Sequence, residues 1–166
     1  RGSREYFKHK TEGVFVPLQA IVDTCGFRVL AVSELPILVP KYNRNGELDS
    51  IAKDQILGII QKGESVQNRN KTLDFRMKTF ASKLNLASHF VRGENDLTSR
   101  EMHCSADIKG YLGENNCFYL LNFWRSFPPE DPDITSHLPS SPRGMSTFFR
   151  MLRPEFVAKY ECPLSP

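Results

Sequence analysis

The sequence has no run of about 20 apolar residues, which is the length that a membrane-spanning helix needs. It also lacks the apolar core of a secretory signal peptide, since it opens on the polar residues RGSR, and it has no initiator methionine there. We therefore predict an excised domain of a larger protein or a tagged fragment, with no membrane span.

Metal-binding patterns of cysteine and histidine are missing as well. The four histidines have no ligand spacing, and the four cysteines are far apart with no CxxC pair. This spacing indicates neither a zinc site nor a dense disulfide framework. We expect free thiols in a reducing compartment, and hence a cytoplasmic protein. The cysteines are Cys25, Cys104, Cys117 and Cys162.

The sequence has little net charge. The formal net charge is +3, and basic residues are spread along the chain without a block of five or six like charges. No strand carries the alternating aromatic and basic residues that single-strand nucleic-acid binders use. Charge and composition therefore do not indicate a nucleic-acid partner.

What the sequence contains is typical of one globular domain. It has 166 residues, 40% of them hydrophobic and 25% charged, which is enough to bury a sizeable core. We interpret residues 1–13 as a lead-in or tag remnant and residues 14–166 as a single domain. Three prolines between residues 130 and 143, directly after the pair Pro128-Pro129, predict an irregular loop there.

Local patterns predict both strands and helices. Two apolar runs, residues 14–22 and 27–32, flank the turn signal Asp23-Thr24-Cys25-Gly26 and predict an antiparallel hairpin. Residues 56–60 predict a further strand of the same sheet. Asn70 is expected to cap a helix whose apolar stripe has helical spacing. That stripe consists of Leu73, Met77, Phe80, Ala81 and Leu84.

The densest set of unusual residues lies between 103 and 129. A strand, a turn over residues 113–116 and a very apolar second strand precede a proline pair. Polar residues flank the two strands, and a hairpin brings them to one rim. These are Asp107, Lys109, Asn122 and Arg125. The fold class that follows is α+β, with a mainly antiparallel sheet and a few packed helices.

Several short motifs carry a resemblance to a known family. Residues 106–111 (ADIKGY), 119–123 (YLLNF), 127–130 (FPPE) and 152–157 (LRPEFV) occur in the order of the Clu domain, and residues 26–37 are similar to it too. The chain is identified as a member of the Clu-domain family of clustered-mitochondria-type proteins, of the protist type. One position departs from the pattern: Asn122 stands where the family usually has an aspartate, which weakens any metal-binding role there.

A second class of function comes from the same layout. An Asp and a Lys two residues apart before a strand–turn–strand, with a polar residue after it, also match the catalytic half of kinase-like phosphotransferases. On that hypothesis Glu34 belongs to the adenine-facing hinge, Asp107 is the base, Lys109 contacts phosphate and Asn122 is a degraded metal ligand. ATP and Mg²⁺ are cofactors only under this alternative, and no glycine-rich phosphate loop accompanies it.

The sequence favours the non-catalytic interpretation. We predict a binding or scaffold module of a larger intracellular Clu-domain protein, with no cofactor and more in keeping with a non-enzyme than an enzyme. Its partner is predicted to be a protein, and the family resemblance implies RNA as a further possibility. The candidate ligand-binding residues are Glu34, Asp107, Lys109, Asn122 and Arg125.

Overall fold

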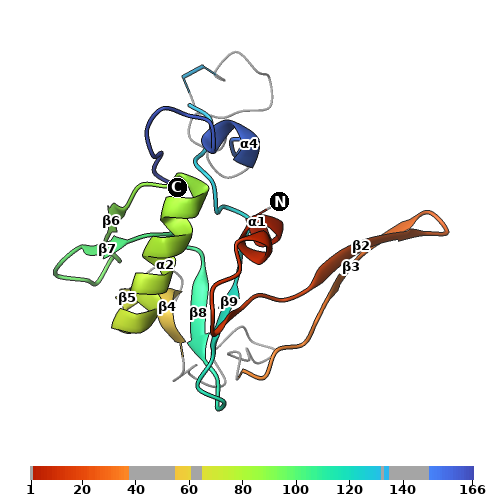
Figure 1. Ribbon diagram of the computed structural model, residues 1–166, viewed down its shortest axis with the longest axis horizontal. Coiled ribbons are helices and arrows are strands. Elements are labelled where there is room, and N and C mark those ends of the chain that lie inside the picture. Colours follow the sequence, from red (N-terminus) through yellow and green to blue (C-terminus); the bar gives the residue numbers. More distant parts are fainter. Residues whose placement is uncertain (1, 38–54, 61–64, 132, 135–149) are drawn as a thin grey trace.

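The computed structural model describes residues 2–37, 55–60, 65–131, 133–134 and 150–166 (Figure 1). Its main sheet has five strands in the order β1-β9-β8-β4-β5. The short β1 pairs parallel to β9, and the other pairs are antiparallel. The strands are β1 (Val14–Phe15), β4 (Gln55–Ile60), β5 (Ser65–Asn68), β8 (Lys109–Leu112) and β9 (Phe118–Leu121).

Helix α2 (Lys71–Leu84) packs on one face of this sheet. The side-chain oxygen of Asn70 accepts a hydrogen bond from the backbone N–H of Leu73 at 3.0 Å, so the predicted cap and helix are confirmed. All five residues of the predicted apolar stripe are buried. Gly110 of β8 lies directly under the helix, because a Cβ there would be 2.8 Å from the Leu73 side chain.

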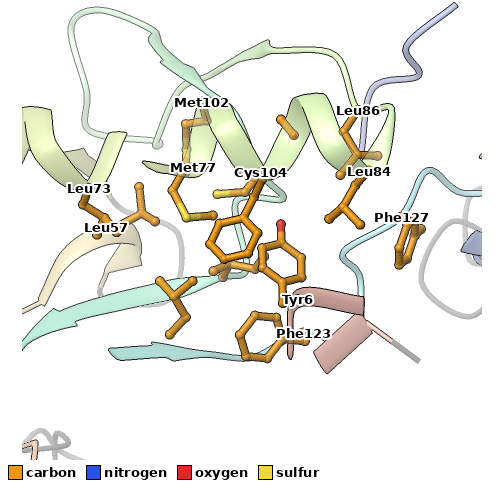
Figure 2. Close-up of a cluster of buried hydrophobic side chains, with 14 of the residues drawn as sticks. Tyr6, Leu57, Leu73, Met77, Leu84, Leu86, Met102, Cys104, Phe123 and Phe127 are labelled. Carbon is orange, nitrogen blue, oxygen red and sulfur yellow. The ribbon is translucent and has the colours of Figure 1, made fainter. Parts of the chain in front are cut away.

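Helix α1 (Gly2–Lys8) closes one end of the core. Tyr6 is 1% exposed, and its ring lies 5.0 Å, centroid to centroid, from both Phe80 and Phe123. Figure 2 shows Tyr6 reaching from α1 into the buried cluster, with its hydroxyl directed toward α2. The segment interpreted from sequence as a lead-in therefore contributes one of the largest fully buried side chains.

The predicted hairpin forms from β2 (Gln19–Thr24) and β3 (Phe27–Val32), which pair antiparallel over their full length. Cys25 (φ 48°) and Gly26 (φ 80°) form the two-residue turn, and left-handed backbone at both positions is what such tight hairpins require. The expectation that residues 56–60 join the same sheet is wrong. β4 belongs to the five-stranded sheet, whereas β2 and β3 form a separate sheet that projects from the body (Figure 1).

Two smaller units complete the described fold. The strands β6 (His89–Val91) and β7 (Arg100–Met102) form an antiparallel ribbon beside β5. The short helix α4 (Pro154–Val157) docks on the end of α2, where the side-chain amide of Asn85 donates to the Val157 carbonyl at 2.8 Å and the Tyr160 carbonyl at 3.0 Å. Most of the predicted proline-rich loop, residues 132 and 135–143, lies outside the described residues. The predicted α+β class with mainly antiparallel pairing is confirmed.

Candidate functional site

The strand–turn–strand predicted for the central stretch is present and positions the predicted rim. Lys109 at the start of β8 is paired with Leu121 at the end of β9. Because the strands are antiparallel, the residues just before β8 and just after β9 lie at the same end of the hairpin. Four of the predicted site residues therefore lie at one end of this hairpin, and we call them the hairpin rim. They are Asp107, Lys109, Asn122 and Arg125.

Within the rim, Asp107 and Arg125 form a bidentate ion pair. The Arg125 Nη2 donates to Asp107 Oδ1 at 2.8 Å, and its Nε lies 2.5 Å from Oδ2. Both side chains are partly buried, with 24% and 29% of their surfaces exposed. Arg125 also lies over the Trp124 ring, 5.7 Å from its centroid. Both carboxylate oxygens of Asp107 thus face a guanidinium, which is a bracing arrangement rather than that of a base open to a substrate proton.

Asn122 has a backbone reason for its identity. Its φ is +65°, in the left-handed region where β9 ends, and Asn and Asp adopt that conformation more readily than other non-glycine residues. Its side chain is exposed, and Lys109 is half-buried at the neighbouring strand start. Asn122 therefore forms the turn after the strand without adding a negative charge.

Glu34 stands apart from the rim. It is exposed on the segment that follows β3, directly after Ser33, whose backbone and hydroxyl both hydrogen-bond Leu18 across the base of the hairpin. It lies at the base of the projecting hairpin, whereas the rim lies where β8 begins and β9 ends (Figure 1). The structure brings together four of the five predicted site residues and not the fifth.

The Asp107–Arg125 pair makes a first prediction about stability. We expect the double-mutant cycle of Asp107→Asn and Arg125→Met to give a coupling free energy of about 1–2 kcal/mol by urea unfolding, since the pair is bidentate and partly buried. The equally bidentate but exposed pair Asp23–Arg28 is the matched control, expected to couple weakly. Additive effects at Asp107 and Arg125 would contradict a bracing role.

A cavity of about 360 Å³ lies beside α1, in a part of the chain that sequence reasoning did not select. Its lining comes from α1, the loop after it, β1 and α2, and is mainly aromatic and aliphatic, with Lys10 and Glu12 as its charged members. Phe15 in this lining stacks on Tyr119 with centroids 5.5 Å apart. The cavity suits an apolar group better than a nucleotide, whose phosphates need several cationic or N–H donors.

Two buried or half-buried ionisable groups of the described residues, Cys104 and His89, have pKa values shifted toward their neutral forms. Burial raises the pKa of the Cys104 thiol to about 12, with a smaller contribution from Asp74. Its thiolate, the nucleophilic form, is therefore suppressed near neutral pH. Burial, followed by the neighbouring charge of His103, lowers the pKa of His89. Across the described ranges, no group of three or more His, Cys, Asp or Glu side chains is arranged to hold a metal ion.

The least expected surface is the projecting hairpin, residues 18–33, which we call the arm. Every residue of β2 and β3 is exposed, and the arm carries seven large exposed apolar side chains, six of them in the two strands. They are Leu18, Ile21, Val22, Phe27, Val29, Leu30 and Val32. Sequence reasoning found this hairpin but not its exposure, because it assumed that an apolar hairpin packs on its own domain. The sequence holds no signal for this exposure, because an apolar pattern shows that a surface avoids water and not what covers it.

Charges on the arm cancel each other. Asp23 and Arg28 are paired across β2 and β3, with the guanidinium donating to the carboxylate at 2.7 Å and 2.9 Å. No other ionisable side chain of the Asp, Glu, Lys or Arg type occurs in residues 18–33. The arm therefore has no net charge, and its surface is mainly apolar.

Comparison with known proteins identifies the family. The family model named "Clustered mitochondria" (CLU) matches residues 1–132, most of the chain and the part that contains both the arm and the rim. The chain belongs to the CLU family. This confirms the resemblance that the short motifs carried in the sequence. The matched range also includes α1, so helix α1 lies within the region that this CLU domain shares with its family.

Curated relatives are much longer than this chain. The CLU domain is 30% identical over 129 residues to the Clustered mitochondria protein homolog of Danio rerio, and 29% identical to that of Xenopus tropicalis. It is 27% identical to the protein clueless of Drosophila ananassae. These alignments cover 78% of the chain but only 8–9% of each relative. No solved structure gives a significant match. Within the described residues, no helix is both long and apolar enough to cross a bilayer.

Proposed function

We propose that this CLU domain is a non-enzymatic binding or scaffold module of a larger protein, and that the arm is its recognition element. The observation that carries this proposal is the exposure of seven large apolar side chains on a neutral, two-stranded projection. Apolar side chains gain free energy when they leave water, and soluble monomers rarely leave so many together uncovered.

The size of this surface supports a specific interaction. Large apolar side chains have accessible areas of roughly 150–200 Å², and those of the arm are about half to three-quarters exposed, so the arm offers on the order of 700 Å². The largest apolar patches on typical monomers are about 300–600 Å², and a standard protein interface buries about 800 Å² on each side. The arm alone comes close to what one side of such an interface needs.

The chemistry of the rim and of the buried thiol also supports a non-enzymatic role. Asp107 is engaged with Arg125, and the one buried thiol, Cys104, has a raised pKa. The carboxylate that the kinase-like hypothesis uses as a base is paired with a guanidinium, and across the described residues no group of three or more His, Cys, Asp or Glu side chains is arranged to hold a metal ion. The geometry favours binding over catalysis.

Site-specific photo-crosslinking in native cells tests the proposal. A photoreactive amino acid replaces Val29 on the arm in one variant and Leu97, which is 97% exposed in the loop between β6 and β7, in a control. We expect mapped crosslinks to protein from position 29 and none of comparable yield from position 97. Equal yields at the two positions, or no crosslinks from the arm, would reject the arm as a recognition element.

A further inference from the structure

Large apolar side chains lie on both faces of the arm. In the register of β2 with β3, Ile21, Leu30 and Val32 lie on one face, which also carries the Asp23–Arg28 ion pair. Val22, Phe27 and Val29 lie on the other face. Each face thus carries at least two large exposed aliphatic side chains. A strand pair that packs on one layer and meets water on the other side alternates apolar and polar residues, whereas one buried on both sides reads apolar throughout. The arm has the pattern of a hairpin that is covered on both faces.

The part of the domain that the structure describes does not provide this cover. All residues of β2 and β3 are exposed, and at the base of the arm the Ser3 hydroxyl of α1 donates to the side-chain oxygen of Gln19 at 3.0 Å. A lone two-stranded hairpin is marginally stable in water. Its strands therefore need a partner for stability as well as for solubility.

We propose that the arm inserts between two apolar layers supplied by a further segment of the same polypeptide. This inference rests on the proposed function and names its partner. The aligned region that contains the arm makes up only 8–9% of each relative, so over nine-tenths of those chains lies outside it. A tethered partner acts at an effective concentration of about millimolar, which suffices for a neutral surface of this size.

The charges of the arm favour a tethered partner over a separate one. Proteins that find each other by diffusion commonly use complementary charge to guide the encounter. The two charges of the arm are already paired with each other, so they offer little for such steering. An arm that docks within its own polypeptide does not need steering.

A second copy of the chain fits less well. If two arms stack face to face, each covers one face of the other and leaves the opposite apolar face in water. One face offers about half of the arm's surface, well below the roughly 800 Å² per partner of a standard interface. Cover on both faces requires a cleft, and the cavity found beside α1 holds about 360 Å³, too little for a whole hairpin.

Hydrogen exchange tests this inference. Amide exchange in residues 18–33 is measured in the 166-residue chain and in the full-length polypeptide that contains it, with β8 and β9 as internal reference. We expect the arm to exchange roughly tenfold or more slowly in the full-length protein, and the reference strands to be unchanged. Ile21→Ser and Val22→Ser, on opposite faces, should each abolish the added protection, whereas Phe75→Ser, at a 70% exposed position of α2, should leave it intact.

Each outcome decides between defined alternatives. Protection in the full-length protein that is independent of protein concentration supports docking within one polypeptide. Protection that appears only as concentration rises indicates a second copy, and protection that needs another protein indicates a separate partner; either overturns this inference but leaves the arm as a recognition element. An arm that is unprotected in the full-length protein and gives no crosslinks in cells rejects both proposals. Loss of protection from only one of the two faces would also overturn the insertion between two layers.

Discussion

Replacing Gly58 with alanine is expected to lower the free energy of unfolding by about 3–5 kcal/mol, a large part of the stability of an ordinary domain. Gly58 lies in the middle of β4, where the pairing with β8 shifts register between Gln55 and Leu57. Its φ is +97°, which side chains rarely adopt, and a Cβ there would lie 2.2 Å from the Ile108 carbonyl oxygen.

The clash has no soft neighbour to absorb it. The atoms nearest the added methyl are backbone atoms of Ile108 and Lys109, so β4 and β8 must move apart. That movement weakens the hydrogen bond, 3.1 Å long, from the Ile59 N–H of β4 to the Ala106 carbonyl in the loop that leads into β8. Backbone strain and overpacking therefore add at one position.

Gly26→Ala is the matched control for this prediction. Gly26 also has a positive φ, +80°, but no atom lies within 4 Å of the position that its Cβ would take. Only the conformational cost, about 1–2 kcal/mol, applies, and it falls on the arm rather than on the core. Urea unfolding of both variants measures the difference. Similar destabilisation by the two alanines would show that the close approach of β4 and β8 is not what demands glycine.

Local signals in the sequence were sufficient for the elements around the rim. The helical spacing from Leu73 to Leu84 and the cap at Asn70 predict α2, and the apolar run that ends at Asn122 predicts β9. The meeting of Asp107 with Arg125 at one rim then follows from hairpin geometry. Their ion pair was not predicted, because the irregular path after β9 decides where Arg125 turns.

The exposure of the arm could not be predicted from its sequence pattern. A hairpin that is apolar on both faces reads the same whether its cover comes from its own domain or from elsewhere. Periodicity reports that a face avoids water, and it carries no information about what covers that face. Whether β2 and β3 join the sheet of β4 depends on tertiary contacts that residues 19–32 do not themselves specify.

The contribution of helix α1 to the core could not be predicted for a related reason. Seven residues are too few to show a helical stripe, and the charged and aromatic residues that take turns in 1–13 predict only a lead-in that packs Tyr6 and Phe7. The burial of Tyr6 is decided by Phe80 and Phe123, which are distant in sequence. Stability measurements on Tyr6 variants therefore test whether the folded domain includes α1.

Tyr6→Ala is expected to cost about 3–5 kcal/mol, as is usual for removing a fully buried aromatic ring. The ring packs against Phe80 and Phe123 with interplanar angles of 38° and 51°, so its loss opens a cavity between α1, α2 and the segment after β9 (Figure 2). A chain that starts at residue 14 should lose at least as much free energy of unfolding, because it lacks the whole of α1. Thermal and urea unfolding measure both changes.

Tyr6→Phe separates the ring from the hydroxyl. The Tyr6 hydroxyl is buried and has no hydrogen-bond partner in the described part of the structure, and burial, together with the nearby Cys104, raises its pKa well above the usual value. Removing an unsatisfied buried hydroxyl relieves a desolvation cost, so Tyr6→Phe should leave stability unchanged or raise it by about 1 kcal/mol. If the shortened chain and Tyr6→Ala both unfold at the wild-type midpoint, residues 1–13 are a lead-in after all. If they are destabilised while Tyr6→Phe is not, the domain includes α1.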